Sequence, residues 1–203
     1  SYSGVVRINT NGLNGTGFVV DDNLILTAAH VVNGQTNVSY TLFNANGTEK
    51  ATYSAASYHV PSNFINGVAG NWDYALIVVN QDLYDYRTID LGVARDKLKL
   101  NYASSVYLNY ASKLGIYVTG CSTYMYTGIG NLVSPYLTDD EVQYNTDTTA
   151  GESGAPVYVK TSNGQMIAIG IHDGYAPPTN PVYNYGKRID TNILHFIYNN
   201  SYI

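Results

Sequence analysis

Short runs of apolar or alternating residues recur about every ten residues along this chain of 203 residues. Asn-Gly pairs, Asp-Asn pairs and single glycines separate the runs and are typical of tight turns. Alternation over so few residues suits a strand with one buried face better than a helix. The pattern therefore predicts an all-β protein built from many short antiparallel strands in a barrel or sandwich.

The expected strands form two sets with a polar stretch between them. The first set is Gly4–Asn9, Gly17–Val20, Asn23–Thr27, Asn37–Phe43, Tyr58–Val60 and Ala75–Val79. The second set is Ser105–Asn109, Gly115–Gly120, Thr123–Gly128, Val142–Asn145, Pro156–Val159, Met166–His172 and Lys187–Ile189. The stretch from Asn80 to about Leu100, with Arg95, Lys97 and Lys99, is the expected linker. We therefore divide the chain into subdomains at residues 1–95 and 96–203.

The periodicity changes near the C-terminus. Ile193, Phe196 and Ile197 have helical spacing and follow the capping cluster Asp190-Thr191-Asn192. This arrangement predicts a short amphipathic helix.

Composition excludes several classes of protein. Apolar residues make up 45% and charged residues 12% of the chain, which favours a buried core over disorder. No apolar run approaches the roughly 20 residues that span a bilayer. The net charge is −5 and Lys187-Arg188 is the longest basic run, so nucleic acid is not an expected partner. We expect a monomer without a membrane span.

Cysteine usage does not indicate the cellular compartment. Cys121 is the only cysteine, so no intrachain disulfide can form. Ser1-Tyr2-Ser3-Gly4 leads directly into the first expected strand, without a signal peptide. We expect the mature form of a secreted protein.

The hexapeptide Gly-Glu-Ser-Gly-Ala-Pro at 151–156 suggests a nucleophile at Ser153. A serine hydroxyl needs a base to take its proton and fixed donors to receive the charge that develops on a carbonyl oxygen. Glycines on both sides allow a turn that directs neighbouring N–H groups to one point. The same pattern also occurs in inert loops, so the rest of the chain must supply support.

That support comes from Thr27-Ala28-Ala29-His30 and Asn71-Trp72-Asp73-Tyr74-Ala75. A neutral imidazole can accept the hydroxyl proton, and a carboxylate can orient the ring and stabilise the imidazolium. Taken singly, His30 suits a strand end and Asp73 a solvated turn. Together with Ser153 they have the order His, Asp, Ser.

This order and these local motifs resemble the chymotrypsin-like serine peptidases, and within them the bacterial glutamyl endopeptidases and exfoliative toxins. The resemblance covers almost the whole chain, the C-terminal helix included. It implies two six-stranded antiparallel β-barrels with the active site in the cleft between them. His30 and Asp73 would come from the first barrel and Ser153 from the second.

The resemblance also implies a role for each residue. Ser153 would be the nucleophile, His30 the general base and then acid, and Asp73 the orienting carboxylate. The backbone N–H groups of Gly151 and Ser153 would form the oxyanion hole. No metal or organic cofactor is needed for this chemistry, and the expected partners are protein or peptide substrates.

The substrate preference is also implied by the resemblance. In glutamyl endopeptidases, a threonine five residues before the nucleophile and a histidine in a Gly-Ile-His segment hold the substrate carboxylate. Thr148 and His172 match these positions, and both side chains can donate hydrogen bonds to a carboxylate. Gly174 and Tyr175 would line the edge of the cleft. Structural roles remain open: Thr148 as a loop residue and His172 as a core histidine.

Two acidic residues depart from this pattern. The arm before the first strand has about three residues and spans only about 10 Å, so it is too short to reach Glu152. We therefore expect Glu152 to be solvated or paired with a lysine. Asp173 would repel an anionic substrate if it faced the pocket, and if it faced Asp73 it would need a hydrogen-bonding partner or a raised pKa. We therefore expect its side chain to point away from the site.

The leading hypothesis is a serine endopeptidase that cleaves after glutamate. One alternative is a peptidase of this fold with a different or single-partner specificity. Another is a non-catalytic binding or adhesion module, for which the 21 tyrosines are suited.

Overall fold

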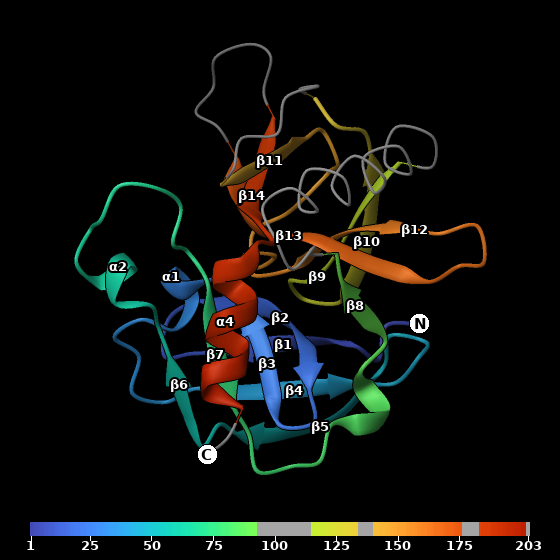
Figure 1. Ribbon diagram of the computed structural model, residues 1–203. Coiled ribbons are helices and arrows are strands. Elements are labelled where there is room, and N and C mark those ends of the chain that lie inside the picture. The colour runs from blue at the N-terminus through green and yellow to red at the C-terminus, as the bar shows by residue number, and fades with distance from the viewer. Residues whose placement is uncertain (93–114, 134–139, 176–182, 202–203) are drawn as a thin grey trace.

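The computed structural model describes residues 1–92, 115–133, 140–175 and 183–201. Two antiparallel sheets form two stacked units, one from each half of the chain (Figure 1). The predicted all-β architecture of two β-units with a short C-terminal helix is confirmed. Within the described residues no helix has the length and apolar character needed to cross a membrane.

The first sheet contains seven strands in the order β5-β4-β1-β2-β3-β7-β6, and all neighbours are antiparallel. These strands are β1 (Val5–Asn9), β2 (Asn14–Asp21), β3 (Leu24–Thr27), β4 (Ser39–Phe43), β5 (Glu49–Ser54), β6 (Ser57–His59) and β7 (Ala75–Val78). All of β3 is buried, because it lies at the centre of the sheet between β2 and β7. The edge strand β5 is polar and mostly exposed, so sequence analysis did not identify it.

The second sheet follows the order β10-β9-β12-β13-β14-β11, with β8 beside β13. Its strands are β8 (Ile89–Leu91), β9 (Ile116–Cys121), β10 (Met125–Gly130), β11 (Glu141–Tyr144), β12 (Pro156–Lys160), β13 (Met166–Tyr175) and β14 (Asn184–Arg188). Only the β8–β13 pair is parallel among the described strands. Each sheet therefore has seven described strands, where six per barrel were expected.

The expected linker is partly structured. It contains the 3₁₀ helix η1 (Tyr84–Tyr86) and strand β8, which joins the second sheet although it precedes residue 95. The basic cluster at 95–99, the boundary between residues 95 and 96, and the expected strand at 105–109 lie outside the described residues. The division into subdomains at this boundary stays a prediction.

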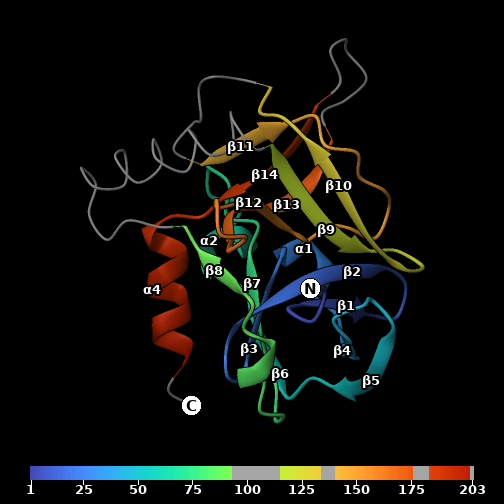
Figure 2. The same ribbon diagram turned by 90° about the vertical axis from the view of Figure 1, so that its right-hand side faces the viewer.

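The short helices α1 (Ala29–Val32) and α2 (Ser62–Ile65) belong to the first unit, and α4 (Thr191–Asn200) is the predicted C-terminal helix. The Asp190 carboxylate accepts the N–H of Ile193 at 3.0 Å and caps α4, as the sequence indicated. The helix packs beside the first sheet in both views (Figures 1 and 2). Phe196 meets Tyr74 edge to face, with ring centroids 5.3 Å apart. The end of the chain thus supports the residue next to Asp73.

Candidate active site

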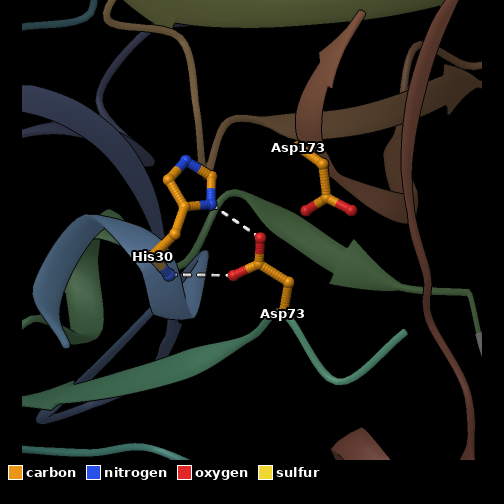
Figure 3. A group of neighbouring side chains, drawn as sticks. All are labelled: His30, Asp73 and Asp173. Carbon is orange, nitrogen blue, oxygen red and sulfur yellow. Dashed lines mark hydrogen bonds and ion pairs between the residues drawn. The ribbon is translucent and has the colours of Figure 1, made fainter. Parts of the chain in front are cut away.

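His30 and Asp73 are joined by two hydrogen bonds (Figure 3). His30 lies on α1, directly after β3, and Asp73 lies just before β7, the neighbour of β3. The backbone N–H of His30 donates to Asp73 Oδ1 at 2.9 Å, and Nδ1 lies 2.6 Å from Oδ2. The hydrogen bond and charge of Asp73 raise the pKa of His30 above 6.5, although burial opposes this shift. The contact leaves Nε2 as the ring atom available to a substrate.

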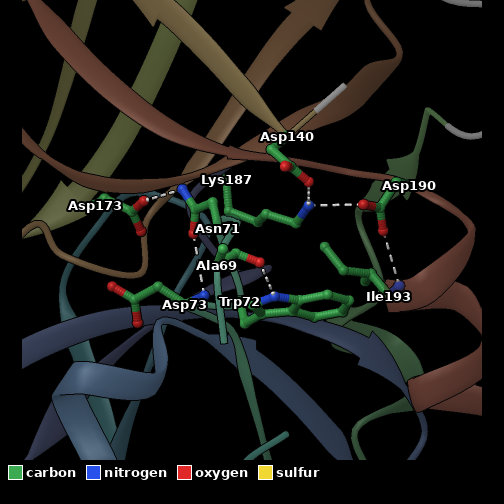
Figure 4. Close-up of polar contacts among 9 residues, drawn as sticks. All are labelled: Ala69, Asn71, Trp72, Asp73, Asp140, Asp173, Lys187, Asp190 and Ile193. Carbon is green, nitrogen blue, oxygen red and sulfur yellow. Dashed lines mark hydrogen bonds and ion pairs between the residues drawn. The ribbon is translucent and has the colours of Figure 1, made fainter. Parts of the chain in front are cut away.

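Asn71 fixes the segment that carries Asp73. The Asn71 side-chain oxygen accepts the backbone N–H of Asp73 at 3.1 Å, and its amide donates to Asp173 Oδ2 at 2.8 Å (Figure 4). One amide side chain therefore links the Asp73 loop to β13 of the second sheet.

The loop that carries Ser153 is attached to the first sheet through Thr16 on β2. The Thr16 N–H donates to Ser153 O at 2.8 Å, and its hydroxyl donates to Gly151 O at 2.9 Å. The same hydroxyl accepts the N–H of Cys121 at 3.0 Å. Ser153 thus comes from the second half of the chain but is positioned by the first sheet.

Glycines allow this close approach. Gly154 has φ of +89°, and a Cβ there would lie 2.1 Å from Thr16 O and 2.2 Å from Thr27 Oγ1. A Cβ on Gly15 would contact both Val31, the neighbour of His30 on α1, and Ser153 O. The serine loop therefore packs against the end of β3 and the helix that carries His30.

The Ser153 hydroxyl donates to the backbone oxygen of Asp173 at 3.3 Å. It makes no hydrogen bond to His30 in the part of the chain that the structure describes. The side chain of Asp173 itself lies within 4.8 Å of both His30 and Asp73. The structure therefore brings the three predicted triad residues to one place, with the serine hydroxyl turned to a backbone carbonyl.

In the turn around Ser153, alternate backbone N–H groups donate hydrogen bonds within the protein. Glu152 N–H donates to Thr149 O and Gly154 N–H donates to His172 O. Within the described residues the N–H groups of Gly151 and Ser153 have no partner. Gly151 has φ of +97°, a conformation that favours glycine. This leaves the two predicted oxyanion-hole donors available for an anionic oxygen.

Glu152 is buried, so the expectation of a solvated or lysine-paired carboxylate was wrong. It is 1% exposed and packs against Gly120, where a Cβ would lie 2.4 Å from Glu152 Cγ. Oε2 accepts the N–H of Thr149 at 2.8 Å, while the buried Oε1 has no partner. Burial raises the pKa of Glu152 to about 7. Because Gly120 on β9 has no side chain, the Glu152 side chain has room to lie in the interior.

Asp173 faces Asp73, so the expectation that its side chain points away was also wrong (Figure 3). The register of β13 against β14 shifts between His172 and Gly174, which makes Asp173 a bulged residue. A β-bulge re-aims a side chain relative to regular alternation. Burial and the nearby charge of Asp73 raise the pKa of Asp173 well above its usual value, against the effect of the Asn71 hydrogen bond.

His30, Asp73 and Asp173 are also the one group of three metal-type donors found in the described residues. Hydrogen bonds already use His30 Nδ1 and both Asp73 oxygens. We therefore assign no metal to this cluster.

His172 is buried and neutral. Its exposed fraction is 3%, and burial, together with the charge of His30, lowers its pKa to about 4. Nδ1 is hydrogen-bonded to the hydroxyl of Tyr144, which also donates to the backbone oxygen of Tyr185 at 3.3 Å. His172 is therefore not a charged imidazolium at neutral pH. It does not add positive charge to a site that would bind a carboxylate.

Thr148 lies in the segment between β11 and β12. It lines a pocket of about 570 Å³ with Ser122, Thr123, Tyr124, Tyr126, Asp147 and Thr149. No contact joins Thr148 to His172 among the described residues. Gly174 is half-buried, and Tyr175 is 69% exposed at the end of β13. The two predicted carboxylate ligands thus do not meet directly in this structure.

Sequence analysis missed three residues that organise the site: Thr16, Asn71 and Tyr144. Each acts through a contact with a residue distant in sequence. Asn71 lies within the Asp73 motif, so its amide was a visible signal. Nothing in the local sequence of Thr16 or Tyr144 distinguishes them from other strand residues.

The fold and the site place this chain in the chymotrypsin-like class. Its residues 15–169 match the model of the trypsin-like peptidase domain, and the chain belongs to this family. A glutamyl endopeptidase from Staphylococcus epidermidis is 26% identical over 96% of this chain. An extracellular metalloprotease from Bacillus subtilis (strain 168) is 28% identical over 93% of this chain. The chain spans 65% and 59% of the lengths of these two relatives.

A solved structure of a Glu endopeptidase in complex with MPD has the same fold. It aligns with a TM-score of 0.74 and 18% identity, covering 98% of this chain and 90% of the other. At this identity the likeness concerns the fold.

Proposed function

We propose that this protein is a serine endopeptidase that acts through an acyl-enzyme. The observation that carries the proposal is the pair of hydrogen bonds between His30 and Asp73 beside the loop of Ser153. A carboxylate on Nδ1 leaves Nε2 as the basic atom, which is the tautomer that can accept a serine proton. Membership in the trypsin-like peptidase family supports the same reading.

In the proposed mechanism the Ser153 hydroxyl leaves Asp173 O and turns to His30 Nε2 as substrate binds. Its oxygen attacks the scissile carbonyl while Nε2 takes the proton, and Asp73 stabilises the imidazolium. The N–H groups of Gly151 and Ser153 receive the oxyanion. The imidazolium then protonates the leaving amine. Water, deprotonated by His30, hydrolyses the acyl-enzyme.

The test compares wild type with Ser153→Ala on a denatured protein mixture. We expect cleavage by wild type, no cleavage by the variant, and labelling of Ser153 by a fluorophosphonate. One relative is named a metalloprotease, so the same cleavage assay is repeated in the presence of a metal chelator. Cleavage that survives Ser153→Ala and stops with the chelator would exclude the proposed mechanism. A folded protein that neither cleaves nor reacts would instead favour a binding module.

We further propose a preference for glutamate before the scissile bond. The positions of Thr148 and His172 and the similarity to a glutamyl endopeptidase support it. The single proton of the Tyr144 hydroxyl can go to Tyr185 O or to Nδ1 of His172; with substrate bound we propose that it goes to Nδ1, so that the imidazole proton resides on Nε2 and can be donated to a substrate carboxylate. His172, the proposed ligand of the substrate carboxylate, would then be an uncharged hydrogen-bond donor.

Peptides that differ only in Glu, Gln or Asp at that position test the preference. We expect Thr148→Val and His172→Leu each to lower kcat/KM for the Glu peptide about tenfold or more, with little change for Gln. His195→Leu, on the exposed face of α4, is the control and should behave as wild type. An unchanged Glu preference in both pocket variants would overturn the assignment.

The location outside the cell is also a proposal. It rests on the relative named extracellular. Detection of the protein in culture medium, rather than in cells, would test it.

A further inference from the structure

Asp173 is a half-buried acid beside Asp73, and the mechanism above assigns no role to its side chain. The two carboxyl groups face each other in Figure 3, and their oxygens lie within the 4.8 Å that spans the cluster with His30. A bulge in β13 aims Asp173 there, and Asn71 holds one of its oxygens. The other oxygen, Oδ1, is buried and has no partner.

The hydrogen bonds decide which of the two acids carries the charge. Asp73 accepts the backbone N–H of His30 and faces its Nδ1, and both contacts stabilise the carboxylate. Asp173 accepts a single side-chain N–H, from Asn71. Two adjacent carboxylates at this distance disfavour double ionisation. The negative charge therefore belongs on Asp73, and a proton belongs on Asp173.

We propose that Asp173 is a neutral carboxylic acid whose Oδ1–H donates to the Asp73 carboxylate, making it a positioning residue for His30. The proposal rests on the triad assigned under the proposed function. A proton on Oδ1 would give the buried oxygen a partner. It would also give Asp73 a second hydrogen-bonding residue besides His30, so that the carboxylate and the imidazole keep their orientation.

Other titratable groups face Asp173 from each neighbouring element. They are His30 on α1, Asp73 before β7, Glu141 and Tyr144 on β11, and Tyr185 on β14. Asp140 lines the same pocket of about 580 Å³ as Asp173. Lys187 on β14 directs its ammonium to Asp140 and Asp190, not to Asp173 (Figure 4). The acidic neighbours add to the repulsion that keeps the proton on Asp173.

The consequence is a specific pH dependence. As pH rises and Asp173 loses its proton, the hydrogen bond to Asp73 is replaced by repulsion between two carboxylates. We therefore expect kcat to fall at alkaline pH. Asp173→Asn keeps a neutral N–H donor of the same shape and cannot ionise, so it should retain neutral-pH activity within about threefold and lack this alkaline limb.

Asp173→Ala removes the donor and should lower kcat roughly ten- to hundredfold with little change in KM. Asp140→Asn, which neutralises another acid of the same pocket, is the matched control and should retain the alkaline limb. Thermal unfolding of each variant verifies the fold. An alkaline limb that is the same in Asp173→Asn and wild type would overturn the proposal, as would equal loss of kcat in Asp173→Asn and Asp173→Ala.

A measurement without substrate separates this proposal from the proposed function. The ¹³C carboxyl resonance of Asp173, identified as the one absent from Asp173→Asn, should remain at its protonated position at neutral pH. An ionised position at neutral pH would overturn the proposal even if the protein is an active peptidase. A protonated position in a protein without peptidase activity would support the acid pair while the proposed function fails.

Discussion

Thr16, on β2 of the first sheet, donates its backbone N–H to the carbonyl oxygen of Ser153 at 2.8 Å. Its hydroxyl meanwhile bridges Gly151 O and the N–H of Cys121. One threonine thus links the expected nucleophile and the expected oxyanion hole to the sheet that carries His30. These three contacts of Thr16 therefore join the two halves of the chain at the site itself.

Replacing Thr16 by valine tests this link. Thr16→Val keeps the shape but leaves Gly151 O and Cys121 N–H buried without their partner. We expect a loss of about 2 kcal/mol in the free energy of unfolding and slower fluorophosphonate labelling of Ser153. Chemical denaturation and labelling rates measure the two effects. The control is Thr36→Val, because Thr36 is exposed and its hydroxyl makes no hydrogen bond among the described residues. Labelling at the wild-type rate in Thr16→Val would show that the hydroxyl does not position the loop.

The contact between His30 and Asp73 predicts the acid limb of activity. His30 must be neutral to accept the serine proton, and Asp73 raises its pKa above 6.5. Activity should therefore fall as pH decreases through a midpoint above 6.5. In Asp73→Asn we expect this midpoint to move to lower pH and kcat to fall about 10⁴-fold. A pH profile of kcat/KM gives the midpoint, and kcat measured at saturating substrate gives the loss of turnover. An acid limb unchanged in Asp73→Asn would assign it to another group.

Glu152 predicts a pH dependence of stability. Its pKa is about 7 in the folded protein and about 4.5 when solvated. Between these values the folded state binds more protons than the unfolded state, so the contribution of Glu152 to stability decreases as pH rises. Glu152→Gln cannot ionise and should gain on the order of 2 kcal/mol relative to wild type between pH 4.5 and 7.

The comparison requires the difference in unfolding free energy between variant and wild type at each pH. Asp85→Asn serves as control, because Asp85 is exposed and its carboxylate makes no hydrogen bond or ion pair among the described residues. A difference that does not vary with pH in Glu152→Gln would mean that Glu152 is ionised throughout.

Because the His172 side chain is neutral, we expect recognition of glutamate to be independent of pH near neutrality. Its pKa of about 4 keeps the free imidazole neutral, so the binding site has no histidine charge to lose. The ratio of kcat/KM for Glu and Gln peptides should therefore stay constant within about twofold from roughly pH 6 to 8. A ratio that declines through about pH 6.5 would indicate that a charged imidazole binds the substrate.

Much of the fold could be predicted from local sequence. Alternation and turn residues gave the positions of β1, β2, β3, β7 and β12 to within a few residues. The Asp190 cluster gave the start of α4. The polar edge strand β5 and the short β8 were missed, because their residues lack the alternation that a half-buried strand requires.

The sequence by itself determined which residues meet as a candidate triad, because His30, Asp73 and Ser153 carry chemistry in motifs that are readable locally. The tertiary structure alone decided the electrostatic state of their neighbours. The bulge in β13 directs the Asp173 side chain toward Asp73. The absence of a side chain at Gly120 leaves room for Glu152 in the interior. Charge state depends on burial and on partners distant along the chain, and neither is a property of the residue or of its sequence neighbours.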